Sequence, residues 1–218
     1  MKKLLYMGFV VLTQLVYGQQ NMKCKEKFDI LIETLEKDKI SIREFNKCKN
    51  ITNELSNYNY YDYIDSVNNR TLYISHSLTK TFADICIKYG GEYGVKYYLD
   101  YVNQNMGSAE EEISFSLERI FMKYPETTLK QIGTDQDLLD KLIWGFINNR
   151  YYGAVNPYEN KDYRAITKYE DEPRPILNKN NCEKIFFETN PILHDLYPKY
   201  KEQIDYILKG AKEQLNFE

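Results

Sequence analysis

The chain has 218 residues, of which 43% are hydrophobic and 28% charged, a composition that allows a globular domain with a core. Its 29 basic and 32 acidic side chains give a net charge of -3, which argues against a nucleic-acid partner held by phosphate contacts. With 10 Gly and 6 Pro, the collagen-like and low-complexity classes are excluded; the unusual feature is aromatic, with 21 Tyr and 10 Phe against one Trp.

Residues 1–18 have the layout of a secretory signal peptide. Lys2 and Lys3 precede an apolar run over 4–16, and Gly18 lies where a signal peptidase needs a small side chain. The alternative is a membrane anchor, but the run is shorter than the roughly 20 residues that span a bilayer. We therefore expect cleavage and a periplasmic or secreted protein, residues 19–218, without a membrane span. Loss of two lysines would change its net charge from -3 to -5.

Helical periodicity begins after the signal segment. Residues 22–37 and 41–57 carry apolar side chains at intervals of three and four, the pattern of a helical hairpin. Ser41 and Glu44 match a capping box, which begins a helix. Residues 57–70 form a polar, Tyr-rich connection. No stretch shows the sustained alternation that predicts a β-strand.

Helices continue from Thr71 to about residue 149. Gly90-Gly91 predicts a left-handed helix stop, and the next helix ends near Gly107. Ser108 with Glu111 predicts another start, and Pro125 opens the helix that follows. That helix runs to Gly133, after which Thr134 or Asp135 caps the next. Helices resume at Ile185, pause at Pro191 and Pro198, and end with a long helix whose apolar stripe runs from Tyr200 to Leu215.

These elements predict an all-α fold: about eight helices in antiparallel hairpins, as an irregular bundle or a short α-solenoid, in one domain over 19–218. One irregular excursion at about 150–180 interrupts them. Long segments of this kind in compact domains are functional or disordered, and its many aromatic residues argue against plain disorder. Tyr and Arg also anchor protein interfaces. We therefore predict a binding surface, with a structural strap over the helices as the alternative, at Arg150, Tyr151, Tyr152, Tyr158, Tyr163, Arg164 and Tyr169.

Four cysteines, Cys24, Cys48, Cys86 and Cys182, lack the Cys-x-x-Cys spacing of zinc and redox sites. In an exported chain an even number favours two disulfides, and three pairings are possible. Sequence order suggests Cys24 with Cys48 and Cys86 with Cys182. Free buried thiols are the alternative.

Catalytic and metal motifs are not found. The sequence has no nucleophile elbow or Walker loop, and its two histidines, His76 and His194, lack metal-site spacing. Glu111 and Glu118 could share one helix face as paired carboxylates, but acids at a helix start usually serve the helix dipole. No cofactor is predicted.

The pattern favours an exported protein that binds another protein without catalysis, in its most concrete form an immunity or inhibitor protein against a toxin or hydrolase. The alternatives are an exported hydrolase with paired carboxylates and a carbohydrate- or peptide-binding helical module. The sequence predicts neither the partner nor the oligomeric state.

Overall fold

Helices make up almost all of the chain that the structure describes. The computed structural model describes residues 24, 26–56, 63–65, 70–72, 74–105, 110–151 and 177–215. After a first helix at residues 26–36 come α2 (Ile42–Ser56), α3 (Ile74–Ile85), the π-helical η1 (Cys86–Gly90), α4 (Gly91–Gln104), α5 (Glu110–Lys123), α6 (Pro125–Ile132), α7 (Gln136–Tyr151), α8 (Cys182–Thr189), α9 (Ile192–Leu196) and α10 (Lys201–Gln214). The predicted all-α fold class is confirmed.

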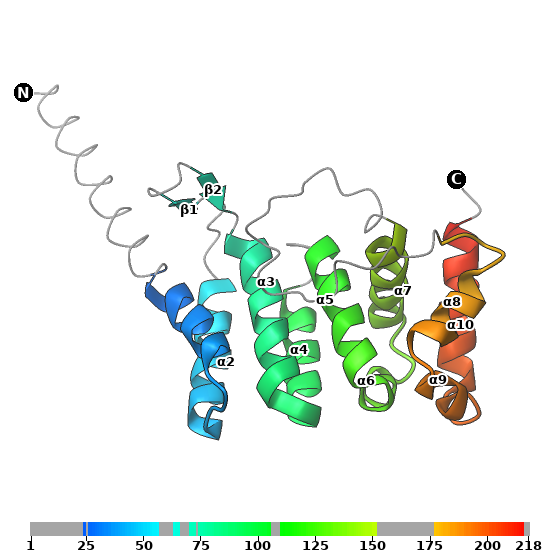
Figure 1. The fold of residues 1–218 in the computed structure, drawn as a ribbon, viewed down its shortest axis with the longest axis horizontal. Coiled ribbons are helices and arrows are strands. Elements are labelled where there is room, and N and C mark those ends of the chain that lie inside the picture. The colour runs from blue at the N-terminus through cyan, green and yellow to red at the C-terminus, as the bar shows by residue number, and fades with distance from the viewer. Residues whose placement is uncertain are drawn as a thin grey trace, which may run out of the picture. The chain divides into compact units, whose positions relative to one another are not determined.

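Two compact units, Met1–Ser108 and Ala109–Glu218, divide the chain. Within each unit the long helices run alternately down and up and are joined at the ends (Figure 1). This is the arrangement of antiparallel helical hairpins that the sequence predicts. The single domain over 19–218 stays a prediction.

The core of the first unit is aromatic at its centre. Phe82 and Tyr98 are completely buried, and the Phe82 ring centroid lies 6.3 Å from that of Tyr98 and 5.5 Å from that of Tyr101. The Tyr101 hydroxyl lies 3.0 Å from Oγ1 of Thr79, so its polar end has a partner inside the core. Burial raises the pKa of Tyr101. Part of the Tyr excess is therefore core, as the helical spacing of Tyr98 predicts.

One short hairpin corrects the expectation that the chain has no strands. Strands β1 (Tyr63–Asp65) and β2 (Arg70–Leu72) pair antiparallel, with Ile64 opposite Thr71. Three residues are too few for an alternating pattern to stand out, and the four-residue connection lacks the Asn-Gly or Asp-Gly pair that marks a tight hairpin.

The second unit packs around Phe186 of α8. Helix α5 packs against α7, α7 against α10, and α10 against α8. The Phe186 ring stacks on Phe121 at 6.1 Å between centroids and meets Phe146 edge-on at 5.2 Å. These three rings come from α8, α5 and α7, so one buried aromatic cluster joins helices that are distant in sequence.

Local signals set several helix boundaries as predicted. Ser41 Oγ accepts a hydrogen bond from the Glu44 amide at 3.2 Å, and the Ser41 amide donates to Glu44 Oε2 at 2.8 Å, which is the reciprocal capping box. Pro125 is the first residue of α6, and Gly133, which follows that helix, has φ +58°. Asp135 Oδ1 accepts a hydrogen bond from the Leu138 amide at 3.2 Å and so caps α7.

The cysteines correct the predicted disulfides. Cys24, Cys48, Cys86 and Cys182 are all buried, and none of them forms a disulfide. A disulfide between Cys24 and Cys48 would need Cys24 to lie in a non-helical segment that folds back. Cys24 instead lies in helical conformation. Burial raises the pKa of Cys24 and Cys48 and raises that of Cys86 well above its usual value, so the thiols stay protonated. They act as small apolar core residues.

None of the helices in the described ranges is both long enough and apolar enough to span a membrane.

Candidate functional site

The Tyr-rich segment predicted to bind a partner falls mostly outside the described residues. Arg150 and Tyr151 are the last two residues of α7, and their side chains are not described. Tyr152, Tyr158, Tyr163, Arg164 and Tyr169 lie outside the described ranges. The binding surface at 150–169 therefore stays a prediction.

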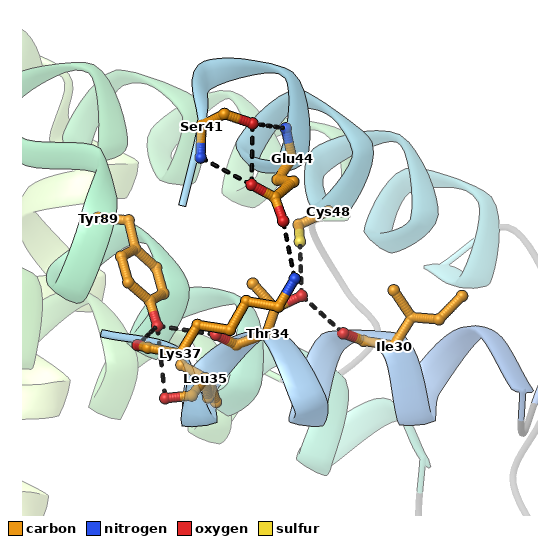
Figure 2. Close-up of polar contacts among 8 residues, drawn as sticks. All are labelled: Ile30, Thr34, Leu35, Lys37, Ser41, Glu44, Cys48 and Tyr89. Atoms are coloured by element: carbon orange, nitrogen blue, oxygen red, sulfur yellow. Dashed lines mark hydrogen bonds and ion pairs between the residues drawn. The ribbon is translucent and has the colours of Figure 1, made fainter. Parts of the chain in front are cut away.

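The carbonyl groups at the end of the first helix form a polar junction with η1 (Figure 2). Tyr89 donates a hydrogen bond to the carbonyl oxygen of Thr34 at 2.7 Å, and Lys88 Nζ donates to those of Leu35 at 2.7 Å and Lys37 at 2.8 Å. The last carbonyls of a helix have no partner within it, and a cation at this end also meets the negative end of the helix dipole. Residues 88 and 89 therefore cap the first helix from more than 50 positions away.

The same junction includes an ion pair between the first two helices (Figure 2). Lys37 Nζ lies 2.7 Å from Glu44 Oε1, while Oε2 of the same carboxylate accepts the capping-box hydrogen bond from Ser41. The bond from Lys37, together with those from Ser41, lowers the pKa of Glu44 from 4.5 to about 2. Glu44 is thus ionised at any physiological pH.

A hydrogen-bonded chain continues into the core from this junction. The Cys48 thiol donates to Thr34 Oγ1 at 3.6 Å, and the Thr34 hydroxyl donates to the Ile30 carbonyl at 2.7 Å. Every group in the junction has a partner within the protein. The junction therefore fixes the first helix, α2 and η1 to one another, and its role is structural.

Only one of the two candidate carboxylates has a described side chain. Glu118 is buried on α5 where Gly145 of α7 passes closely. The side chain of Glu111 is not described, so the predicted pair of Glu111 and Glu118 is not tested. Over the described ranges, no group of three or more His, Cys, Asp and Glu side chains could hold a metal ion.

The strongest candidate for a functional surface is aromatic and lies on α8 and α9. The His194 ring, which is exposed, stacks on the Phe187 ring with 4.4 Å between centroids and 17° between planes. Tyr197 meets Phe187 edge-on at 6.0 Å. Phe187 and Tyr197 are half-buried, so each keeps part of its surface in solvent. We call Phe187, His194 and Tyr197 the aromatic surface.

Contacts on both sides hold the aromatic surface in place. Phe187 meets Phe186 edge-on at 5.5 Å, which links it to the buried aromatic cluster. The Tyr197 hydroxyl donates to Asp205 Oδ1 of α10 at 2.8 Å, and Lys201, 5.5 Å from the Tyr197 ring centroid, forms an ion pair with the same carboxylate. The hydrogen bonds from Lys201 and Tyr197 lower the pKa of Asp205. Phe187 and Tyr197 are therefore each held by contacts within the second unit.

Two prolines interrupt the helices in this region, and the turns at these prolines bring the rings together. Helix α8 ends at Thr189, Pro191 precedes the short α9, and Pro198 separates α9 from α10. The side-chain amide of Asn190 donates to the Met122 carbonyl at 3.0 Å, which pins the turn after α8 to the end of α5. The reversal places the residues of α9 beside the last turn of α8.

The sequence does not predict this surface. His194 stands out there only as one of two histidines without metal-site spacing; the structure places it on the surface, stacked on Phe187. One available signal is the pair Phe186-Phe187, because neighbouring residues of a helix lie about 100° apart around its axis and cannot both point to the centre of one core. Phe186 is buried, and Phe187 is half-buried.

No protein-family model, curated protein or solved structure matches this chain.

Proposed function

We propose that this protein binds another protein through the aromatic surface and performs no catalysis. The observation that carries the proposal is the exposed His194 ring stacked at 4.4 Å on Phe187. Aromatic side chains are enriched at protein interfaces because they offer a large contact area with few rotatable bonds.

The fixed geometry of the surface supports this proposal. Binding loses less free energy to ordering when the contact groups are already held in place. Asp205 and Lys201 hold Tyr197, and the buried ring of Phe186 supports Phe187. A rigid aromatic group of this kind has the features of an interface anchor, which inserts into a pocket of the partner or packs on a flat apolar patch.

The finer parts of the proposal concern location and partner. Export to the periplasm or exterior is supported by the signal-like residues 1–18 alone, because cysteines that form no disulfide do not argue for an oxidising compartment. An immunity or inhibitor role rests on the acidic net charge, which suits a basic target. The Tyr-rich residues at 150–169 are proposed as a second part of the same interface.

The rival hydrolase and carbohydrate-binding functions receive less support. A hydrolase of the predicted kind needs two carboxylates facing one cleft, and of the predicted pair only the side chain of Glu118 is described. A carbohydrate platform commonly uses tryptophan, and the one Trp, Trp144, lies on α7 outside the aromatic surface.

Photo-cross-linking tests the proposal. A photoreactive phenylalanine analogue replaces His194 in one variant and Tyr158 in a second. As a control it replaces Gln214, which is exposed near the end of α10, nine residues beyond Asp205. We expect irradiated cell extract to give one discrete protein adduct from position 194, the same adduct from position 158, and none from position 214. Equal labelling at 194 and 214, or no adduct at 194, would sink the proposal.

A further inference from the structure

The first unit exposes two large apolar side chains at one end. Ile42 in the first turn of α2 is 69% exposed, and Tyr93 in the first turn of α4 is 72% exposed. Single exposed apolar residues need no explanation, but the helix starts that carry these two are in contact. Phe45, three residues after Ile42, packs on Gly90, three residues before Tyr93: a Cβ at Gly90 would come within 3.0 Å of the Phe45 ring. Figure 1 shows the starts of α2 and α4 at the same lower end of the unit.

The charge at this end is opposite to that of the whole chain. Residues 37–47 contain four basic and two acidic side chains, and residues 88–96 contain two basic and one acidic, so the two segments together carry +3 in a chain of -3. Lys37 and Glu44 neutralise each other, and Lys88 bonds to the end of the first helix. The other charged side chains of the two segments are all exposed: the basic Lys39, Arg43, Lys47 and Lys96 and the acidic Asp38 and Glu92, a net charge of +2. We call the four basic residues with Ile42 and Tyr93 the basic end.

We propose that the basic end docks on an anionic phospholipid surface. The basic end combines two projecting apolar side chains with four exposed cations, which suits a headgroup layer. Its lysines and arginine meet lipid phosphates, while Ile42 and Tyr93 enter the boundary with the acyl chains. Tyrosine suits this depth because its ring is apolar and its hydroxyl polar. This surface shares no residue with the aromatic surface, and the proposal does not depend on the proposed protein-binding function.

Size favours a lipid surface over an acidic protein. A stable protein interface buries about 800 Å² on each partner around a packed apolar centre. The basic end offers two isolated apolar side chains, with the half-buried Tyr97 covered by Lys49 at 3.9 Å from its ring centroid. A lipid layer needs no matching pocket, since it deforms around each side chain.

Vesicle co-sedimentation tests the proposal with the full-length protein. The probes are vesicles of phosphatidylcholine alone and of phosphatidylcholine with 30% phosphatidylglycerol, a ratio chosen on the order of natural anionic content. We expect binding to the anionic vesicles only, and release on raising the salt to about 0.5 M, where charges are screened within a few ångströms.

Three variants separate the contributions. In K39Q/R43Q/K96Q we expect about 100-fold weaker binding, because each cation near an anionic surface raises the affinity about fivefold. In I42S/Y93S we expect about tenfold weaker binding with the same dependence on salt. The control K130Q/K184Q/K209Q removes three exposed lysines of the second unit and should bind like the unmodified protein. Circular dichroism confirms that each variant keeps its helices.

Several outcomes would overturn the proposal. One is absence of binding to the anionic vesicles by the unmodified protein, and another is equal weakening in the control variant. Polyglutamate is the third probe. If polyglutamate binds the protein and K39Q/R43Q/K96Q weakens that binding, while the vesicles do not bind, the basic end binds an acidic protein instead.

Discussion

The Tyr89 hydroxyl donates a hydrogen bond to the carbonyl oxygen of Thr34 at 2.7 Å, across 55 positions of sequence. Thr34 lies near the end of the first helix, and Tyr89 lies in the π-helical turn η1 that precedes α4. A π-helical turn widens the helix locally and changes where its side chains point. Here that turn carries Lys88 and Tyr89, whose side chains donate hydrogen bonds to the last carbonyl groups of the first helix.

The first prediction concerns this hydroxyl. In Tyr89→Phe the ring stays and the donor is lost, so we expect the free energy of unfolding to fall by about 1 kcal/mol, the usual net value of one hydrogen bond. Urea denaturation followed by circular dichroism measures it. The matched control is Tyr93→Phe, since Tyr93 is 72% exposed and its hydroxyl lies in water. Equal stability of the two variants would contradict the capping role.

A second prediction concerns the pH dependence of the Glu44 ion pair. The pKa of Glu44 in the folded protein, about 2, lies below its usual 4.5, so the ionised form stabilises the fold. This contribution is complete above pH 4.5 and is lost as the pH falls towards 2. We expect Glu44→Gln to have a lower Tm than the unmodified protein at pH 7, and the difference to shrink between pH 4.5 and 2. A difference that stays constant over that range would contradict the assignment.

Close packing of α5 on α7 gives a third prediction. A Cβ at Gly145 would lie 2.1 Å from the Ser114 carbonyl oxygen, which belongs to rigid helix backbone. Gly145→Ala should therefore destabilise the second unit by about 1–3 kcal/mol, the usual cost of overpacking. Gly210→Ala is the control, because its Cβ would meet the Cδ1 of Ile143, the movable end of a side chain, at 2.6 Å. The account requires the larger loss at position 145 in thermal unfolding.

The state of the cysteines gives a fourth prediction. Because none of the four buried cysteines forms a disulfide, protein unfolded in guanidinium without reductant should take up four maleimide groups, as measured by mass spectrometry. The folded protein should react slowly, since burial keeps the thiols protonated. A mass unchanged after alkylation of the unfolded chain would show two disulfides and contradict the structure.

Boundaries set by neighbouring residues could be predicted from the sequence. Ser41 and Glu44 are three positions apart and satisfy each other's backbone and side-chain groups, so the pattern itself contains the interaction. Pro125 and Gly133 act through their own backbone preferences. Such signals predict the structure correctly because they act between residues that are close in sequence and do not depend on a distant contact.

Features that depend on distant contacts could not be predicted. Tyr89 has the spacing of a core residue on a helical stripe, but its hydroxyl reaches the end of the first helix because η1 is π-helical. The disulfide prediction relied on an even number of cysteines and an exported location, neither of which fixes the distance between two thiols. The stack of His194 on Phe187 depends on the reversal of the chain between α8 and α9.

The most direct test of the central claim is the affinity of the purified protein for the partner identified by cross-linking. We expect His194→Ala to weaken equilibrium binding by about 30-fold, the loss typical of an interface anchor. Gln214→Ala, an exposed change elsewhere on α10, should leave the Kd unchanged. A Kd for His194→Ala equal to that of Gln214→Ala would show that the aromatic surface does not bind the partner.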